Sequence, residues 1–168
     1  MHQSEQLPFF VYGTLLPDQP NFYLWDDSII EMQPAKFWGG QLYDMGFYPM
    51  LVVEEVETAV HGQLITVRAE AYEAVLQRLD VLEGYDPAQP DSSEYIRQQV
   101  SVTLADGRSA DAWLYLGQPE LVADKPEIPG GNWAVYAAEN QQTLQEWWEA
   151  IQTVAGLHNP TTSNPQQK

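Results

Sequence analysis

Hydrophobic and polar residues alternate along several short stretches of the chain, and this period of two predicts β-strands. The clearest stretch is residues 95–104, in which one face carries Ile96, Val100, Val102 and Leu104. Residues 105–107, Ala-Asp-Gly, are typical of a hairpin turn, so residues 111–116 are predicted as the return strand. Four more strands are predicted from apolar or alternating runs: residues 7–12, 37–43, 48–53 and 60–67.

A helical period replaces this alternation at residues 70–82, where the apolar stripe contains Tyr72, Val75, Leu76, Leu79 and Leu82. A second helix is predicted over residues 132–155, with a stripe of Leu144, Trp147, Trp148, Ile151 and Val154. Thr143 and Glu146 have the spacing of a capping box, so a separate helix could begin there.

The order of these elements predicts the fold class. Strands precede and flank one central helix and another helix follows, which favours an α+β fold: a small mixed, mostly antiparallel β-barrel with flanking helices. We expect one domain over residues 1–157 and a disordered polar tail over residues 158–168. The Pro- and Gly-rich residues 117–131 are either a plain connector or a lid over a site.

The charge balance narrows the possible partners. The 168 residues include 7 Lys and Arg against 24 Asp and Glu, a formal net charge of −17. Such a surface repels nucleic-acid phosphates and anionic membranes, so we expect neither as a partner. No apolar run approaches the roughly 18 residues of a membrane span, and residues 1–6 lack a signal pattern, so a cytoplasmic protein is expected.

The residue inventory also limits the chemistry. The chain has no cysteine, and its three histidines, His2, His61 and His158, lie far apart without the spacing of a metal site. Glycine-rich nucleotide motifs and the Gly-x-Ser-x-Gly nucleophile pattern do not occur, so no cofactor and no metal are expected. The sequence gives no indication of the oligomeric state.

Glu83 is the first candidate for chemistry because it continues the apolar stripe of the predicted helix 70–82. Gly84 follows in the position of a C-terminal cap. An anion there is partly desolvated and meets the negative end of the helix dipole, and both effects raise the pKa of the carboxyl. Glu83 is therefore a candidate for proton transfer. Alternatively, it ends the stripe in solvent or pairs with an arginine.

Two further segments could bind a ligand. Tyr12-Gly13-Thr14-Leu15 directly follows a predicted buried strand, and a turn at glycine can aim several backbone N–H groups at a carboxylate or an oxyanion. Tyr95 and Arg97 share one face of their strand and could orient a carboxylate. Taken alone, the first segment could be an ordinary turn and the second an ordinary solvent-facing strand.

Together these motifs resemble the γ-glutamylcyclotransferase-like family over roughly residues 7–116. The resemblance depends on the order of six segments: Phe10-Val-Tyr-Gly-Thr-Leu15, Tyr48-Pro49, Val60-His-Gly62, Leu79-Asp-Val-Leu-Glu-Gly-Tyr85, Tyr95-Ile-Arg97 and Ala112-Trp-Leu-Tyr115. The first and the fourth are specific as a pair, although neither is specific alone. Gly131-Asn-Trp133 resembles a segment of some members.

The resemblance implies a small β-barrel and a reaction without cofactor or metal. The α-amine of a γ-glutamyl group attacks its own γ-carbonyl, which releases 5-oxoproline and a free amine, amino acid or peptide. By resemblance Glu83 is the base, Tyr12, Gly13, Thr14 and Leu15 hold the substrate, and Tyr95 lines the pocket. Arg97 either faces the pocket or belongs to an outer salt network. The alternative is a binding module on the same fold that holds γ-glutamyl or amino-acid ligands without turnover.

Overall fold

The computed structural model describes residues 6–46, 48–89 and 93–140. The chain divides into two compact units, residues 1–134 and 135–168. The first holds every strand described below; in the second, the described residues 135–140 contain most of helix α2 (Trp133–Glu139). The rest of the predicted helix 132–155, its capping box and the polar tail lie outside the described residues. The single domain over residues 1–157 stays a prediction.

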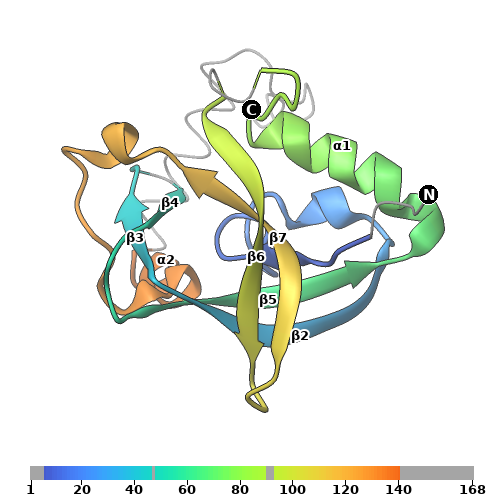
Figure 1. The fold of residues 1–168 in the computed structure, drawn as a ribbon, viewed down its shortest axis with the longest axis horizontal. Coiled ribbons are helices and arrows are strands. Elements are labelled where there is room, and N and C mark those ends of the chain that lie inside the picture. Colours follow the sequence, from blue (N-terminus) through green and yellow to red (C-terminus); the bar gives the residue numbers. More distant parts are fainter. Residues whose placement is uncertain (1–5, 47, 90–92, 141–168) are drawn as a thin grey trace, which may run out of the picture. The chain divides into compact units, whose positions relative to one another are not determined.

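Five strands form a closed barrel in the order β1-β5-β2-β6-β7 (Figure 1). They are β1 (Phe9–Val11), β2 (Ile29–Trp38), β5 (Ala59–Val67), β6 (Tyr95–Leu104) and β7 (Ser109–Gly117). All neighbours are antiparallel except β1 and β7, whose parallel contact closes the barrel. Closure removes the unpaired edges that an open sheet would expose. The predicted mixed, mostly antiparallel barrel is thus confirmed.

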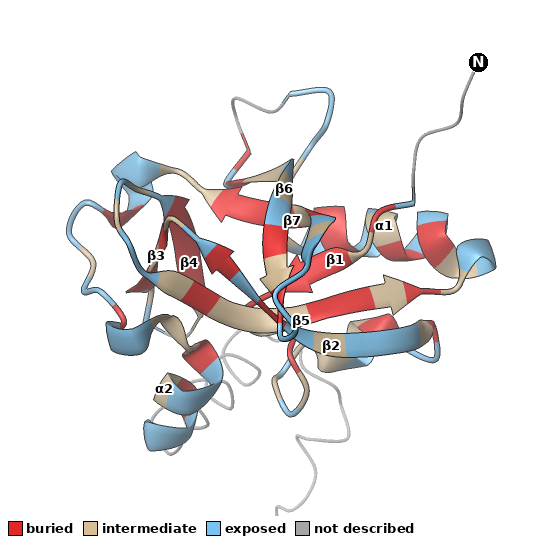
Figure 2. Ribbon diagram, turned by 60° about the horizontal axis from the view of Figure 1, so that its bottom comes forward, coloured by how far each residue is buried: buried red, intermediate tan, exposed pale blue. Residues whose placement is uncertain are grey.

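The predicted strand 37–43 is wrong, because Gly39 divides it between two sheets. Gly39 has a φ of 90°, a backbone conformation that side chains other than glycine rarely adopt. Before it, β2 extends back to Ile29; after it, β3 (Gly40–Asp44) pairs with β4 (Pro49–Val53) in a separate two-stranded sheet. Most of β2 is exposed (Figure 2), so its first residues lack the apolar pattern that would have predicted a strand.

Helix α1 (Tyr72–Leu82) follows the 3₁₀ turn Ala69–Ala71 and lies against the barrel. Tyr72, Val75 and Leu79 are buried as predicted, and the Tyr72 ring stacks on Phe9 of β1. Leu82, predicted to be buried, is 37% exposed, whereas Asp80 is 9% exposed. At about 100° per residue, Glu83 falls between the buried positions 79 and 80, while Leu82 lies about 60° to the other side of Leu79.

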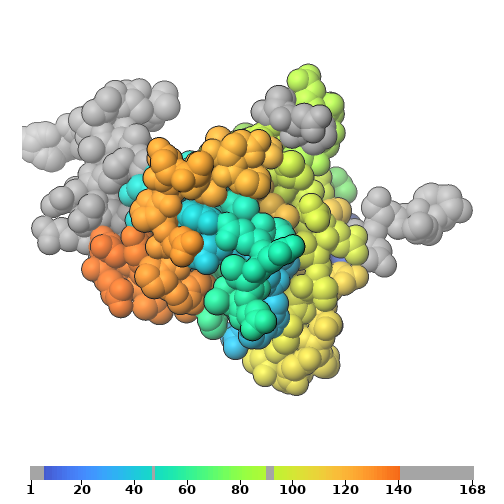
Figure 3. Space-filling model, turned by 60° about the vertical axis from the view of Figure 1, so that its left-hand side comes forward, coloured from blue at the N-terminus to red at the C-terminus, as the bar shows by residue number. Residues whose placement is uncertain are grey.

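The segment of residues 117–131 is fixed to the small sheet. The Ile128 N–H donates to the Leu42 carbonyl oxygen at 2.8 Å, and the Asp44 N–H donates to Pro126 at 2.8 Å. Ile128 is fully buried. Figure 3 shows these residues, coloured orange, packed over the cyan and teal residues of β3 and β4. The contacts, together with the 3₁₀ turns Pro119–Val122 and Pro129–Gly131, support the connector interpretation rather than a lid.

A search of the described helices for a membrane span finds none that is long and apolar enough.

Candidate active site

Glu83 is the C-cap residue of α1, one position before the glycine that was predicted to cap the helix. Its N–H donates to the Leu79 carbonyl oxygen at 2.9 Å, and Gly84 follows with a φ of 67°. The Tyr85 N–H then donates to the backbone carbonyl oxygen of Asp80 at 2.9 Å, and the Gly84 N–H donates to that of Val81 at 3.2 Å. These two bonds form a Schellman motif, which satisfies the last carbonyl groups of the helix and fixes the direction of the chain at Glu83.

The carboxyl of Glu83 is surrounded by protein atoms, although the residue as a whole is only half-buried. Burial, together with the smaller effects of the negative charges of Glu94 and Asp80, raises the pKa of Glu83 to about 8. The predicted rise of its pKa therefore follows from geometry, and Glu83 is not among the acids that form ion pairs in the described part of the chain.

Four tyrosines share the electrostatic environment of Glu83. Burial raises the pKa of Tyr12, Tyr95 and Tyr115 well above 10, and the Glu83 charge adds to the rise in each. Burial raises the pKa of Tyr48 to about 12, with Glu94 and then Glu83 as further causes. Because such charge effects act over short distances, Glu83 and these hydroxyl groups lie in one region of the fold.

The turn after β1 is held from several sides. The Leu16 N–H donates to Gly13 at 3.0 Å, and the Asn21 side chain donates to the Thr14 hydroxyl oxygen at 2.9 Å. A Cβ atom on Gly13 would lie 2.6 Å from Cγ of Pro49, so only glycine fits there without a shift. Within the described residues, the N–H groups of Gly13, Thr14 and Leu15 donate to no protein acceptor. They remain available for an anionic ligand.

Tyr12 and Tyr95 brace this turn against β4. The Tyr12 hydroxyl accepts a hydrogen bond from the Leu51 N–H at 3.3 Å, and the Tyr95 hydroxyl donates to the Pro49 carbonyl oxygen at 3.0 Å. The structure thus brings Tyr12, Gly13 and Tyr95 together around β4, close to Glu83. Tyr95 is buried and Arg97 is half-buried, so the solvent-facing interpretation of their strand is wrong.

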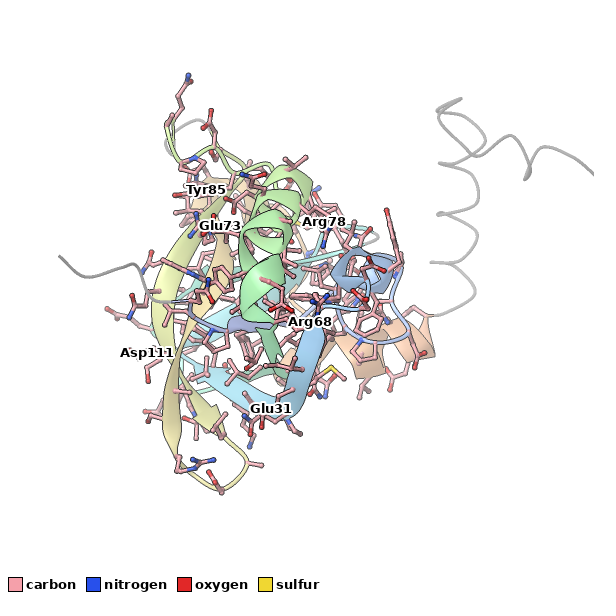
Figure 4. All side chains as sticks on the ribbon, turned by 90° about the vertical axis from the view of Figure 1, so that its right-hand side faces the viewer. Glu31, Arg68, Glu73, Arg78, Tyr85 and Asp111 are labelled. Atoms are coloured by element: carbon pink, nitrogen blue, oxygen red, sulfur yellow. The ribbon has the colours of Figure 1, made fainter. Side chains whose placement is uncertain are left out.

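Asp80 is a functional candidate that the sequence interpretation missed. It accepts hydrogen bonds from Nε of Arg97 at 2.9 Å, from Nη2 of Arg97 at 3.3 Å and from the Tyr115 hydroxyl at 2.6 Å. The guanidinium of Arg97 also lies over the rings of Trp113 and Tyr85, 4.6 and 5.3 Å from their centres. Figure 4 shows Tyr85 beyond the end of α1. An acid at the edge of the apolar stripe of an amphipathic helix was the available signal.

Comparison with known families assigns the chain to a family. The family model described as gamma-glutamyl cyclotransferase, AIG2-like, matches residues 9–135. The chain belongs to this family. Its members share the fold described above, and the predicted resemblance is confirmed. Among proteins with curated descriptions, none matches the chain significantly.

Several solved structures share this AIG2-like cyclotransferase fold. YkqA from Bacillus subtilis superposes with a TM-score of 0.59 at 22% identity, over 81% of this chain and 42% of that protein, so the present chain spans less than half of YkqA. The protein ytfP from Escherichia coli has 28% identity and a TM-score of 0.52, over 76% and 96% of the two chains. A structure described as gamma-glutamyl cyclotransferase has 14% identity and a TM-score of 0.50, over 72% and 69%.

A cavity of about 620 Å³ lies elsewhere on this family member, between β2, β5 and β6. Lys36, His61 and Thr103 occupy neighbouring positions in its wall, and none of the predicted site residues lines it. Within residues 6–46, 48–89 and 93–140, no group of three potential metal-ligating side chains is found.

Proposed function

We propose that this family member is a γ-glutamyl cyclotransferase that releases 5-oxoproline. The observation that carries the proposal is the position of Glu83, a carboxyl whose pKa is raised to about 8, in the same region as the glycine turn after β1. In the proposed step, the α-amine of the substrate attacks its own γ-carbonyl carbon. A carbon–nitrogen bond forms in the five-membered ring, and the bond to the leaving amine breaks.

Glu83 carries protons from the attacking nitrogen to the leaving nitrogen. As a carboxylate it accepts a proton from the α-ammonium group, which frees the amine to attack, and as a carboxylic acid it passes that proton to the leaving nitrogen. The second proton, which the ring nitrogen loses after the new bond forms, follows the same route, so the leaving group departs as an ammonium ion. A pKa of about 8 is close to that of an α-amino group, so neither transfer is strongly uphill. The atoms balance without added water, and the intramolecular attack gains rate from proximity.

The turn after β1 would stabilise the negative charge that develops on the γ-carbonyl oxygen. Its candidate donors are the N–H groups of Gly13, Thr14 and Leu15, which have no acceptor within the described residues. Backbone donors fixed in place before the reaction are effective because they need little reorganisation as charge develops. Tyr12 and Tyr95 would hold this turn in register with β4.

The charges near Glu83 favour a leaving group that is not an anion. The negative charge of Glu94 contributes to the raised pKa of Glu83, and the chain as a whole has a net charge of −17. A γ-glutamyl amine avoids the repulsion that the carboxylates of glutathione would meet. We therefore expect γ-glutamyl amines, whose leaving group carries no carboxylate, to react faster than γ-glutamyl amino acids and glutathione.

The test is release of 5-oxoproline from a panel of γ-glutamyl amines, γ-glutamyl amino acids and glutathione. Product that forms in proportion to enzyme, with the amines preferred, supports the proposal. Saturable binding of γ-glutamyl compounds with no product from any of them would replace it with the alternative of a non-catalytic binding module.

A further inference from the structure

Asp80 and Arg97 form an ion pair that has no role in the reaction as written above. The side chains of Arg97 and Asp80 are 13% and 12% exposed, in contrast to the Arg108–Asp106 pair at 71% and 55%. A carboxylate withdrawn from solvent to this degree is stable as an anion only with good partners. Asp80 has three such hydrogen bonds, two from Arg97 and one from Tyr115.

The contacts of this ion pair also lie on both sides of Glu83 in the sequence. Asp80 lies one helical turn before Glu83 and therefore beside it on α1, and its carbonyl oxygen accepts the N–H of Tyr85. Tyr85 in turn packs its ring against the guanidinium of Arg97. Arg97 thus contacts Asp80, three residues before Glu83, and Tyr85, two residues after it.

We propose that Asp80, paired with Arg97, is a positioning residue that fixes both the place of Glu83 and the charge that surrounds it. This inference rests on the proposed function for its meaning in catalysis. Its physical content is separate: the Asp80 anion opposes ionisation of Glu83, and Arg97 limits that effect by neutralising Asp80.

The charged and titratable groups around Glu83 come from several elements. Asp80 is on α1, Glu94 precedes β6, Arg97 is on β6 and Tyr115 is on β7. Tyr12 approaches from the turn after β1, and Tyr48 approaches from the turn before β4. Tyr95 approaches from β6. Burial raises the pKa of all four tyrosines, so they stay neutral near pH 8. Near that pH the charge balance at Glu83 therefore depends on Asp80, Glu94 and Arg97.

The two partners predict shifts of opposite sign. Asp80→Asn keeps the shape, removes the negative charge and leaves Arg97 positive, so the pKa of Glu83 falls, by at least about half a unit. Arg97→Met keeps much of the apolar packing and leaves the Asp80 charge uncompensated, so the pKa of Glu83 rises. If the ion pair had a purely structural role, the pKa of Glu83 would fall in both variants, toward the ordinary value of an exposed carboxyl.

The experiment is an NMR titration of the Glu83 carboxyl carbon in the full chain, without substrate. It compares the wild type, Asp80→Asn, Arg97→Met and the matched control Asp106→Asn, which breaks the exposed ion pair of Arg108. Opposite shifts with an unchanged control support the inference. Shifts of the same sign, or none, overturn it. If Asp80→Asn does not fold, the sign of the Arg97→Met shift alone decides.

The pH profile of kcat/KM links this titration to catalysis. In Asp80→Asn its acid limb is expected to move to lower pH by the same amount as the Glu83 titration. The failures can be told apart: a wild type that releases no 5-oxoproline refutes the proposed function whatever the titrations show. Turnover without opposite shifts refutes only the positioning role.

Discussion

The hydroxyl of Tyr12 donates a 3.0 Å hydrogen bond to the backbone carbonyl oxygen of Tyr115, whose own hydroxyl donates to Asp80 at 2.6 Å. One residue of β7 therefore ties the turn after β1 to the last turn of α1. Both bonds are buried, where an unmade hydrogen bond costs most. The distance between the candidate base and the candidate oxyanion donors is in this way set by the rigid barrel wall.

Replacing Glu83 tests its proposed role as the base. Glu83→Gln keeps the size and polarity of the side chain but cannot accept a proton, so kcat is expected to fall at least about a hundredfold. The measurement is 5-oxoproline release, with circular dichroism to verify the fold. Glu73→Gln, an exposed position on the same helix, is the control and keeps full activity. A Glu83→Gln enzyme as active as the wild type would remove Glu83 from the mechanism.

The pH dependence follows from the raised pKa. Because Glu83 must be ionised to accept the proton and its pKa is about 8, only a small fraction of the enzyme is competent near neutral pH. We expect kcat/KM to rise about tenfold per pH unit up to about pH 8. Initial rates from pH 5.5 to 9.5 measure this limb. A midpoint near 4.5 would mean that burial does not control the ionisation of the base.

The stability of the protein should depend on pH through the same group. The pKa of Glu83 is 4.5 in an unfolded chain and about 8 in the folded one, so between these values the unfolded state has released a proton that the folded state keeps. The folded state therefore loses stability as pH rises from about 4.5 to 8, and the full cost remains above 8.

Glu83→Gln removes this cost, and relative to the wild type it should gain on the order of 2 kcal/mol between pH 5 and pH 9, allowing for partial solvent screening. Urea denaturation of both proteins at the two pH values measures the difference. Glu73→Gln should show none. A Glu83→Gln protein that gains nothing at pH 9 would contradict the raised pKa.

The close approach of Gly13 and Pro49 can be tested by a compensating pair. Gly13→Ala places a Cβ atom 2.6 Å from Cγ of Pro49, which should displace the turn and lower kcat/KM about tenfold or more. Pro49→Ala removes the atoms in the way, so the double variant should recover part of the loss. Steady-state kinetics of both single variants and the double variant give the coupling. No recovery would mean that Gly13 acts through something other than this contact.

The amino-acid sequence predicted those parts of the fold whose signals are local. The periodicity of residues 70–82 located α1, and the Asp-Gly turn located the hairpin of β6 and β7. It failed at residues 29–43, because an exposed strand such as β2 has little apolar pattern and Gly39 moves the chain from one sheet to another. The site residues followed partly from periodicity and partly from the family resemblance.

By itself the sequence determined that an acid and a glycine end a buried helical stripe, because a helix repeats within four residues and a cap within six. The sequence could not determine which distant residues bind the side chains around Glu83. Asp80 meets Arg97 17 positions away, and Tyr12 meets Tyr115 103 positions away. Those meetings depend on the register of β1, β6 and β7 in the closed barrel, and register is a property of the assembled sheet rather than of any one strand.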